Sequence, residues 1–252
     1  MPRQARRKSE TGIYHIMVRG VNRQQVFIDD EDCIKFLWKM EQAKQRSDFK
    51  LYGYCLMGNH AHLLLCQGEE PLSQITQRLF SSYVYWYNWK YDRIGHLFQE
   101  RFKSEVVETD AYLIAVLRYI HQNPVKAGIT DSAANYRWSS YSEYLGKPKI
   151  TDTDLILKMY SADSQRAVSA FVKHTGESNN DKCLEYVEIR RYSDEDLLDY
   201  IKENYGVGKS SFESLPQSEL GQILRGLKAI EGVTIRQIVR VTGSSKYKVE
   251  RA

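Results

Sequence analysis

The sequence has few cysteines and no long apolar run, and these two absences exclude several classes of protein. Its four cysteines are scattered over 252 residues and form no close pair, which argues against a zinc ribbon or a disulfide-stapled secreted scaffold. No stretch approaches the roughly 20 apolar residues that a membrane-spanning helix needs. The basic N-terminus is not followed by an apolar run, so no signal peptide is evident. We therefore expect a cytoplasmic protein with no membrane partner.

The net charge is small, +4, but it is unevenly distributed. Residues 1–150 carry 21 Lys and Arg against 16 Asp and Glu, whereas the remainder carries 15 against 16. Part of the excess lies in Arg3, Arg6, Arg7 and Lys8 at the start of the chain. A basic arm of this kind suits contact with a phosphate backbone, although solubility alone explains it too.

Periodicity predicts the secondary structure of the first part. Apolar and aromatic alternation predicts strands, and a 3.6-residue period predicts helices. We expect strands over 11–21, 51–57, 60–66 and 103–107, and helices over 33–46, 73–91 and 111–122, the last stopped by Asn123-Pro124. This order favours an α+β fold, a ferredoxin-like antiparallel sheet with helices packed on one face.

The second part reads as an all-α domain. Gly146–Lys149 is typical of a linker, so the sequence predicts one domain over residues 1–148 and a helical domain over 149–252. Residues 234–251 have the spacing of a helix-turn-helix, with Lys246 and Lys248 on the second helix suited to phosphates or bases. A plain helical hairpin with a solvated charged face explains this short pattern equally well.

Two histidines at strand spacing are the sharpest chemical feature. In His60-Ala61-His62 the imidazoles lie at i and i+2, hence on one face of a strand about 6.5–7 Å apart. That spacing allows both to bind one metal ion. A pair of hydrogen-bonded or exposed histidines at the start of a strand is the alternative reading.

A tyrosine and an asparagine one helical turn apart form the second feature. Tyr119 and Asn123 lie at i and i+4 of the predicted helix and share one face. A phenol beside a carboxamide suits a nucleophile and a metal ligand. The alternative is a packed tyrosine followed by an ordinary helix end.

Together these features resemble those of a known family. The motifs GNHAHLL (58–64), GHLFQERFKS (95–104) and RYIHQNPVKAG (118–128) resemble those of the HUH single-tyrosine transposases of the insertion-sequence 200-like kind. Among these, the chain is most similar to relatives associated with repetitive extragenic palindromes (REP). The resemblance covers about residues 12–128, roughly half of the chain, and implies that residues 1–148 are a transposase catalytic domain.

The resemblance also implies roles for the matching residues. Tyr119 takes the position of the catalytic nucleophile, and His60, His62 and Asn123 take those of the ligands of a divalent metal, Mg²⁺ or Mn²⁺. The implied reaction is cleavage and rejoining of single-stranded DNA near a hairpin through a 5′-phosphotyrosine, by a homodimer or a monomer. The alternative functions are a non-catalytic DNA-binding regulator with the transposase fold and a phosphodiesterase that forms no covalent intermediate.

Further residues are candidates for DNA contact. Arg101 and Lys103 suit backbone phosphates, with a structural role equally possible, and Arg118 is a third candidate. The aromatic run over residues 83–91 suits stacking on unpaired bases, but a packed helix face is the favoured interpretation. For His15 and His121 a packing role is favoured over a catalytic one.

Overall fold

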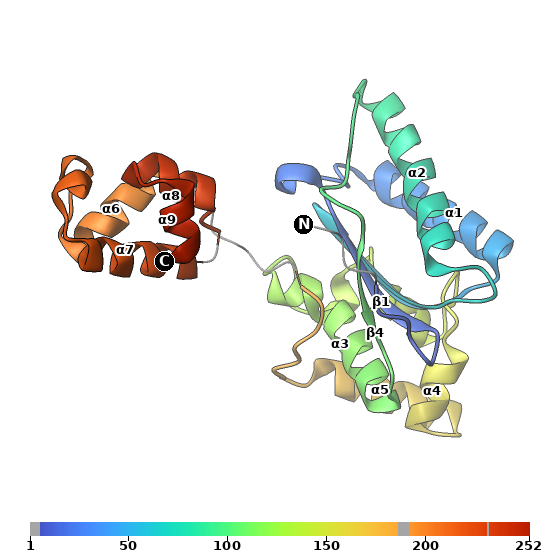
Figure 1. The fold of residues 1–252 in the computed structure, drawn as a ribbon. Coiled ribbons are helices and arrows are strands. Elements are labelled where there is room, and N and C mark those ends of the chain that lie inside the picture. Colours follow the sequence, from blue (N-terminus) through green and yellow to red (C-terminus); the bar gives the residue numbers. More distant parts are fainter. Residues whose placement is uncertain (1–5, 186–191, 231) are drawn as a thin grey trace. The chain divides into compact units, whose positions relative to one another are not determined.

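The computed structural model divides into two compact units, Met1–Glu185 and Tyr186–Ala252, and each is described by itself (Figure 1). The structure describes residues 6–185, 192–230 and 232–252. Arg3 therefore lies outside the described residues, and the basic arm is represented from Arg6 onward.

The first unit is built on a four-stranded antiparallel sheet with the strand order β2-β3-β1-β4. Its elements are β1 (Ile13–Arg19), the short 3-10 helix η1 (Val21–Arg23), α1 (Asp30–Ser47), β2 (Lys50–Met57), β3 (His60–Cys66), α2 (Leu72–Lys90), β4 (Lys103–Val106) and α3 (Asp110–Lys126). The βαββαβ order with this pairing is a ferredoxin-like unit. The predicted α+β fold is confirmed.

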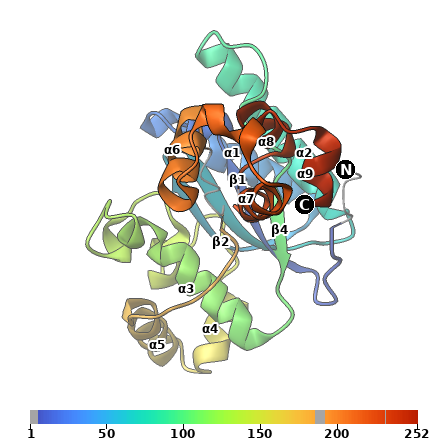
Figure 2. The same cartoon turned by 60° about the vertical axis from the view of Figure 1, so that its left-hand side comes forward.

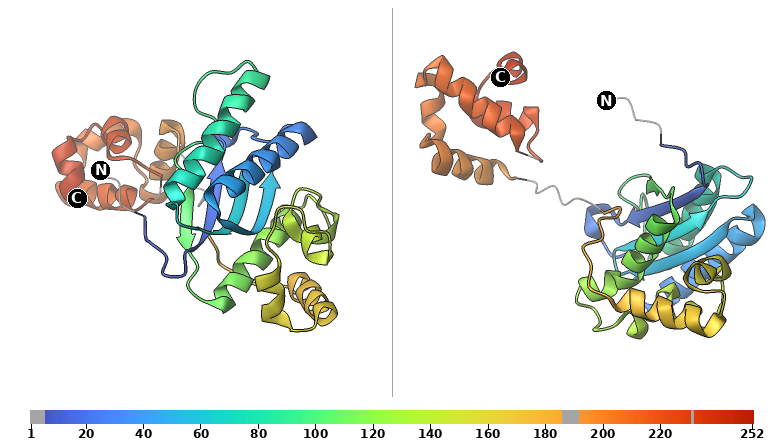
Figure 3. Two further views of the ribbon diagram at one scale, coloured as in Figure 1. Left: turned by 90° about the vertical axis from the view of Figure 1, so that its right-hand side faces the viewer. Right: turned by 90° about the horizontal axis from the view of Figure 1, so that it is seen from below.

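Helices cover both faces of this sheet, as Figure 3 shows. On β1 the alternating residues Tyr14, Ile16 and Val18 face a core shared with α1 and α2. The residues that alternate with the first-core positions on the other strands, such as Leu64 on β3 and Cys55 on β2, face a second core with α3. The expectation of helices on one face thus holds for α1 and α2, whereas α3 packs on the opposite face because its apolar side meets a sheet surface that is also apolar.

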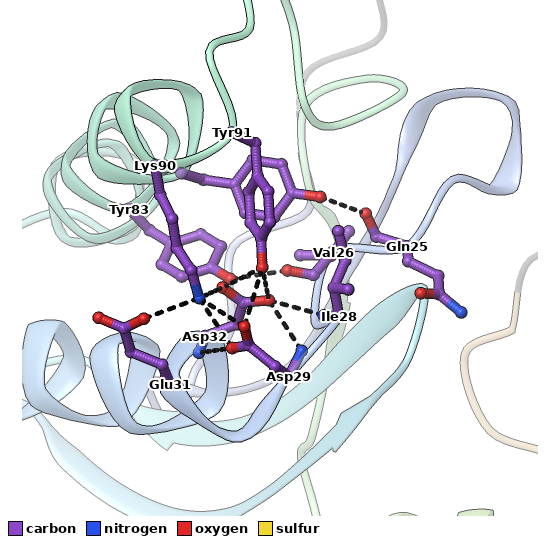
Figure 4. A network of polar contacts seen from close by, with 10 residues as sticks. Gln25, Val26, Ile28, Asp29, Glu31, Asp32, Tyr83, Lys90 and Tyr91 are labelled. Carbon is purple, nitrogen blue, oxygen red and sulfur yellow. Dashed lines mark hydrogen bonds and ion pairs between the residues drawn. The ribbon is translucent and has the colours of Figure 1, made fainter.

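A buried polar network closes the first face between α1 and α2 (Figure 4). Asp29 and Asp32 form a capping box at the start of α1. Lys90, near the end of α2, lies 2.8 Å from an oxygen of Asp29 and 3.0 Å from one of Asp32. The Tyr91 hydroxyl donates to Asp32 at 2.8 Å. These bonds tie the beginning of one helix to the end of the other.

Helix α3 does not stop at Asn123-Pro124 as the sequence predicted. It continues to Lys126 with Pro124 inside it, and the amide of Ala127 still bonds to the carbonyl of Asn123 at 3.0 Å. Proline removes one helical donor, but at the last turn of a helix few bonds remain to be lost. As a result Asn123 keeps a helical position, one turn after Tyr119.

The first unit also extends well beyond the predicted boundary at residue 148. The carboxylate of buried Glu143 accepts from the amides of Lys149, Ile150 and Thr151 at 2.7–2.9 Å, which fixes the segment read as a linker. The following helices α4 (Asp154–Tyr160) and α5 (Ser164–Gly176) add Ile156 and Phe171 to the α3-side core. Short 3-10 helices η2 (Ala133–Asn135) and η3 (Ser140–Leu145) precede them. The linker was predicted from composition alone, and these contacts show that the segment is part of the first unit.

The second unit is helical, with a core of its own (Figure 2). It contains α6 (Asp194–Tyr205), η4 (Lys209–Ser214), α7 (Gln217–Ala229), α8 (Ile235–Thr242) and α9 (Lys246–Arg251). Gly243 ends α8 in a left-handed conformation at φ 68°, which glycine adopts without a steric penalty. Across the described parts of both units, no helix has the length and apolarity to span a membrane.

Candidate active site

The two histidines of β3 lie side by side on the α3 face of the sheet. His60 and His62 have ring centroids 5.1 Å apart, with the rings nearly perpendicular. In the neighbouring strand β1, Arg19 pairs with His60 and Met17 with His62. The i, i+2 spacing therefore brings the imidazoles together without any distortion of the strand.

Tyr119 reaches the same place from α3. Its ring lies 5.6 Å from that of His62, edge to face, and the residue is 2% exposed. Asn123, one turn later, donates its side-chain amide to the backbone carbonyl of Tyr119 at 3.4 Å, and its carboxamide acts on the pKa of both His60 and Tyr119. The phenol, the carboxamide and the two imidazoles thus meet at one point between β3 and α3.

One ring nitrogen of His62 contacts another histidine, and the other ring nitrogen has no hydrogen-bond partner among the described residues. Its Nδ1 lies 2.9 Å from Nε2 of His15 on β1, and the two rings stack at 5.2 Å. Its Nε2 is buried and has no hydrogen-bond partner among the described residues. A buried polar atom without a partner is costly in a folded protein, and a bound ion is one of the ways in which its bonding is completed.

Burial keeps these imidazoles neutral. It lowers the pKa of His60 to about 4, with a smaller contribution from the positive charge of Arg19. It lowers the pKa of His15 to about 3 and that of His62 well below its ordinary value. A neutral imidazole is the form that binds metals.

Tyr119 is protonated and covered. Its hydroxyl donates to Glu185 Oε1 at 2.8 Å. Burial, the hydrogen bond to this carboxylate and its negative charge all raise the pKa of Tyr119. Residues 177–185, which we call the covering segment, follow α5 and run along α3, where Asp181 forms a bidentate pair with Arg118 at 2.8 Å.

The protein donors available to a metal are few. No group of three or more histidine, cysteine or carboxylate side chains in the described part of the chain has a geometry suited to a metal ion. His60 and His62 could offer two nitrogens and Asn123 one amide oxygen to a metal. Such a mixed set would leave coordination positions open, as sites that bind substrate phosphates do.

Comparison with known proteins identifies the first unit. The model of the family "Transposase IS200 like" matches residues 8–123. Residues 8–123 belong to the IS200-like transposase family. The family predicted from the sequence and the enzyme class, transposase, are thereby confirmed. No curated protein sequence matches the chain significantly.

One solved structure shares the fold of this unit. A REP-associated tyrosine transposase bound to a REP hairpin matches with a TM-score of 0.51 and 15% identity, over 61% of this chain and 96% of that chain. A crystal structure from Deinococcus radiodurans R1, described as a transposase, has a TM-score of 0.34 and 15% identity, over 51% of this chain and 92% of its own. At this identity the first match shows a shared fold and no more.

The predicted DNA contacts of the transposase are spread over separate elements. Arg101 is exposed and lines a cavity of about 300 Å³ with Arg6 and Phe102, while Lys103 is half-buried at the start of β4. Arg118 is engaged with Asp181, so its guanidinium is already occupied. In the second unit Lys246 and Lys248 lie exposed on α9.

The sequence did not predict three residues of the site. It favours a packing role for His15, and it gives no role to Arg19 or Glu185. His15 is fully buried, as packing requires, but it also bonds to His62. The alternation of Tyr14, Ile16 and Val18 on β1 placed His15 on the opposite face, which was a usable signal. For Glu185, 66 residues beyond Tyr119 in sequence, no local pattern existed.

Proposed function

We propose that this transposase is a metal-dependent endonuclease and strand transferase for single-stranded DNA, acting through a 5′-phosphotyrosine on Tyr119 and recognising hairpin DNA. One observation carries the proposal: Tyr119, Asn123 and the pair His60 and His62 converge across β3 and α3. A DNA-binding regulator has no use for this set of side chains.

The residues account for the chemistry of strand transfer. Tyr119 Oη attacks the phosphorus of a phosphodiester, its phenolic proton departs, and the bond from phosphorus to the 3′-oxygen breaks. The released 3′-oxygen takes up a proton and becomes a hydroxyl, so charge and atoms balance. Attack of another 3′-hydroxyl on the phosphotyrosine runs the same exchange in reverse and joins strands without a further energy source.

The donor set fits a divalent cation. The unpaired Nε2 of His62, the neutral His60 beside it and the carboxamide of Asn123 are ligands that Mg²⁺ or Mn²⁺ accept, with imidazole favouring Mn²⁺. Such a cation, when bound, would withdraw negative charge from the scissile phosphate. Arg19, whose charge acts on His60, and Lys126, 4.9 Å from the centre of the Tyr119 ring, add positive charge around the same phosphate.

DNA recognition is assigned to basic residues outside this centre. Arg101 and Lys103 would contact the backbone beside the cleaved strand, and Lys246 and Lys248 on α9 would contact a duplex, because α8 and α9 have the spacing of a helix-turn-helix. The solved relative of similar fold was bound to a REP hairpin, which supports hairpin DNA as the substrate class.

Trapping of the covalent intermediate tests the proposal. The full chain is incubated with labelled single-stranded hairpin DNA and Mn²⁺, denatured, and examined for a protein–DNA adduct. We expect an adduct that requires the metal and disappears in Tyr119→Phe. Tyr160→Phe, which removes a half-buried phenol that bonds to His174 on α5, is the matched control and should leave it intact.

The alternatives predict other outcomes. An adduct that survives Tyr119→Phe would refute the nucleophile. Product formation with no adduct would indicate a phosphodiesterase that forms no covalent intermediate. Binding without any cleavage would indicate a regulator.

A further inference from the structure

A third histidine, behind the pair His60 and His62, supports an inference beyond the proposed function. His15 on β1 is fully buried, and its Nε2 contacts Nδ1 of His62 at 2.9 Å. Behind His15, Glu105 of β4 is its direct cross-strand partner, and Oε2 of Glu105 lies 3.9 Å from Nδ1 of His15. Three strands thus contribute one row of side chains, Glu105, His15 and His62, that leads to the site.

The contact between the imidazoles leaves two tautomer arrangements. If His15 donates, Nε2 of His62 carries the proton and is a buried N–H without an acceptor among the described residues. In that case Nδ1 of His15 also presents its lone pair toward the Glu105 carboxylate, which is unfavourable. If His62 donates instead, its Nε2 carries a free lone pair, and the Nδ1–H of His15 faces a negative charge. The second arrangement also leaves a buried N–H, that of His15, without a hydrogen-bond acceptor, but it directs this N–H toward a carboxylate 3.9 Å away, so it is the more favourable of the two.

His60 shows a similar arrangement on its own side. Its Nδ1 lies 2.6 Å from the carboxamide oxygen of Asn59, and this oxygen accepts hydrogen bonds only. Nδ1 of His60 is therefore the protonated nitrogen, and its Nε2 is the one left to act as a ligand. Both imidazoles are thus anchored through Nδ1.

We propose that His15 is a positioning residue that fixes His62 as the Nδ1–H tautomer and presents the Nε2 lone pair to a divalent cation, with Glu105 orienting His15. The assignment of that cation to strand transfer rests on the proposed function, but the tautomer does not. Glu105 is itself held by the Tyr112 hydroxyl at 2.6 Å and the amide of Leu184 at 3.1 Å. Partners of this kind behind metal ligands fix the ring orientation, and their loss weakens metal binding about 10- to 100-fold.

The tautomer can be measured on the metal-free protein. We expect long-range ¹H–¹⁵N correlation spectra of the histidine-labelled full chain to show His62 protonated at Nδ1 and bare at Nε2. A wild-type His62 protonated at Nε2 would overturn the inference. This measurement needs neither DNA nor an amino-acid substitution that endangers folding.

Variants of His15 test the consequence for metal binding. His15→Phe keeps an aromatic ring but removes the acceptor, so we expect His62 to change tautomer and Mn²⁺ affinity, measured from the electron paramagnetic resonance signal of free Mn²⁺, to fall about 10- to 100-fold. His15→Gln supplies an acceptor oxygen and should restore the affinity to within a few-fold. His121→Gln, at a buried histidine that is hydrogen-bonded to Ser140 at 2.8 Å, is the control and should change neither quantity. Unchanged tautomer and affinity in His15→Phe would refute the role of His15.

Failure of this inference is distinguishable from failure of the proposed function. The predicted tautomer together with an absent DNA adduct would leave the positioning role intact and remove the strand-transfer chemistry. An adduct on Tyr119 together with the opposite tautomer would do the reverse.

Discussion

The two faces of the sheet each carry a buried polar network, and the two networks differ in how far their atoms are paired. Between α1 and α2, Asp32 accepts from the amide of Ile28, the Tyr91 hydroxyl and the Lys90 ammonium at 2.6–3.0 Å (Figure 4). In the described residues, no buried atom of this network lacks a partner. Under α3, by contrast, Nδ1 of His15 and Nε2 of His62 are both buried and unpaired.

Under the proposed function, this difference separates a structural network from a functional one. A network whose donors and acceptors satisfy one another contributes to stability and has nothing left to offer a ligand. A network with an unpaired lone pair carries a cost in the free protein that a bound cation and phosphate would offset. Substitutions on the first face should therefore act on stability, and substitutions on the second face on catalysis.

The largest effect is expected from Asp32→Ala. It leaves the mostly buried Lys90 ammonium with fewer partners and removes the Asp32 half of the capping box, so the unfolding free energy should fall by about 3–5 kcal/mol. Asp30→Ala, in the same turn, breaks only an exposed pair with Arg137 and should cost about 1 kcal/mol or less. Urea denaturation measures both. Loss of the DNA adduct in folded Asp32→Ala would contradict the division between the faces.

His62→Gln should show the opposite behaviour. It removes a proposed metal ligand, so we expect the rate of adduct formation to fall at least about 100-fold, which corresponds to about 2.7 kcal/mol in the barrier. Its unfolding free energy in the presence of a chelator should change less than that of Asp32→Ala. The rate is measured by quenching the trapping reaction at fixed times, with His121→Gln as the control. A stability loss as large as that of Asp32→Ala would make His62 a structural residue.

The buried histidines also predict a pH dependence of stability on the α3 face. Burial depresses the pKa of His15 and of His121 to about 3 and that of His62 well below its ordinary value. Below about pH 6.5 the unfolded chain binds protons that the folded chain does not, so stability is lost as the pH falls. At pH 5 the loss approaches about 2 kcal/mol for His15 and for His121.

Metal-free denaturation between pH 7.5 and pH 5 checks this dependence. His121→Gln retains a polar partner for Ser140 and should reduce the slope of stability against pH by the share of one histidine. A slope that stays unchanged would show that His121 is protonated in the folded protein.

Local sequence patterns predicted the parts of the site that local geometry determines. The alternation over residues 60–66 was sufficient to place His60 and His62 on one face, and the helical period to place Asn123 one turn after Tyr119. The resemblance of the motifs predicted that the histidine strand and the tyrosine helix meet. This prediction did not depend on knowing the register of the sheet.

The remaining features depend on long-range contacts that no periodicity encodes. His15 contacts His62 across 47 residues because β1 pairs with β3 in one particular register, and a shift of one residue would turn it to the other face. The segment around Gly146 has the composition of a linker, but in the structure the Glu143 carboxylate accepts hydrogen bonds from the amides that follow it. Such partners are specified by the packed fold as a whole.

The smallest effect is expected at Glu185. It tests whether the covering segment restricts access to Tyr119 on the α3 face in the absence of DNA. Tyr119 is 2% exposed, and the covering segment places the Glu185 carboxylate on its hydroxyl, where a DNA phosphate would approach under the proposed function. Glu185→Gln keeps an acceptor oxygen but removes the charge that repels the phosphate and raises the pKa of Tyr119. We expect adduct formation at pH 7 to become a few-fold faster, about 1 kcal/mol in the barrier. Glu177→Gln, at the other end of the segment, should leave the rate unchanged, whereas a slower Glu185→Gln would identify Glu185 as the acceptor of the phenolic proton.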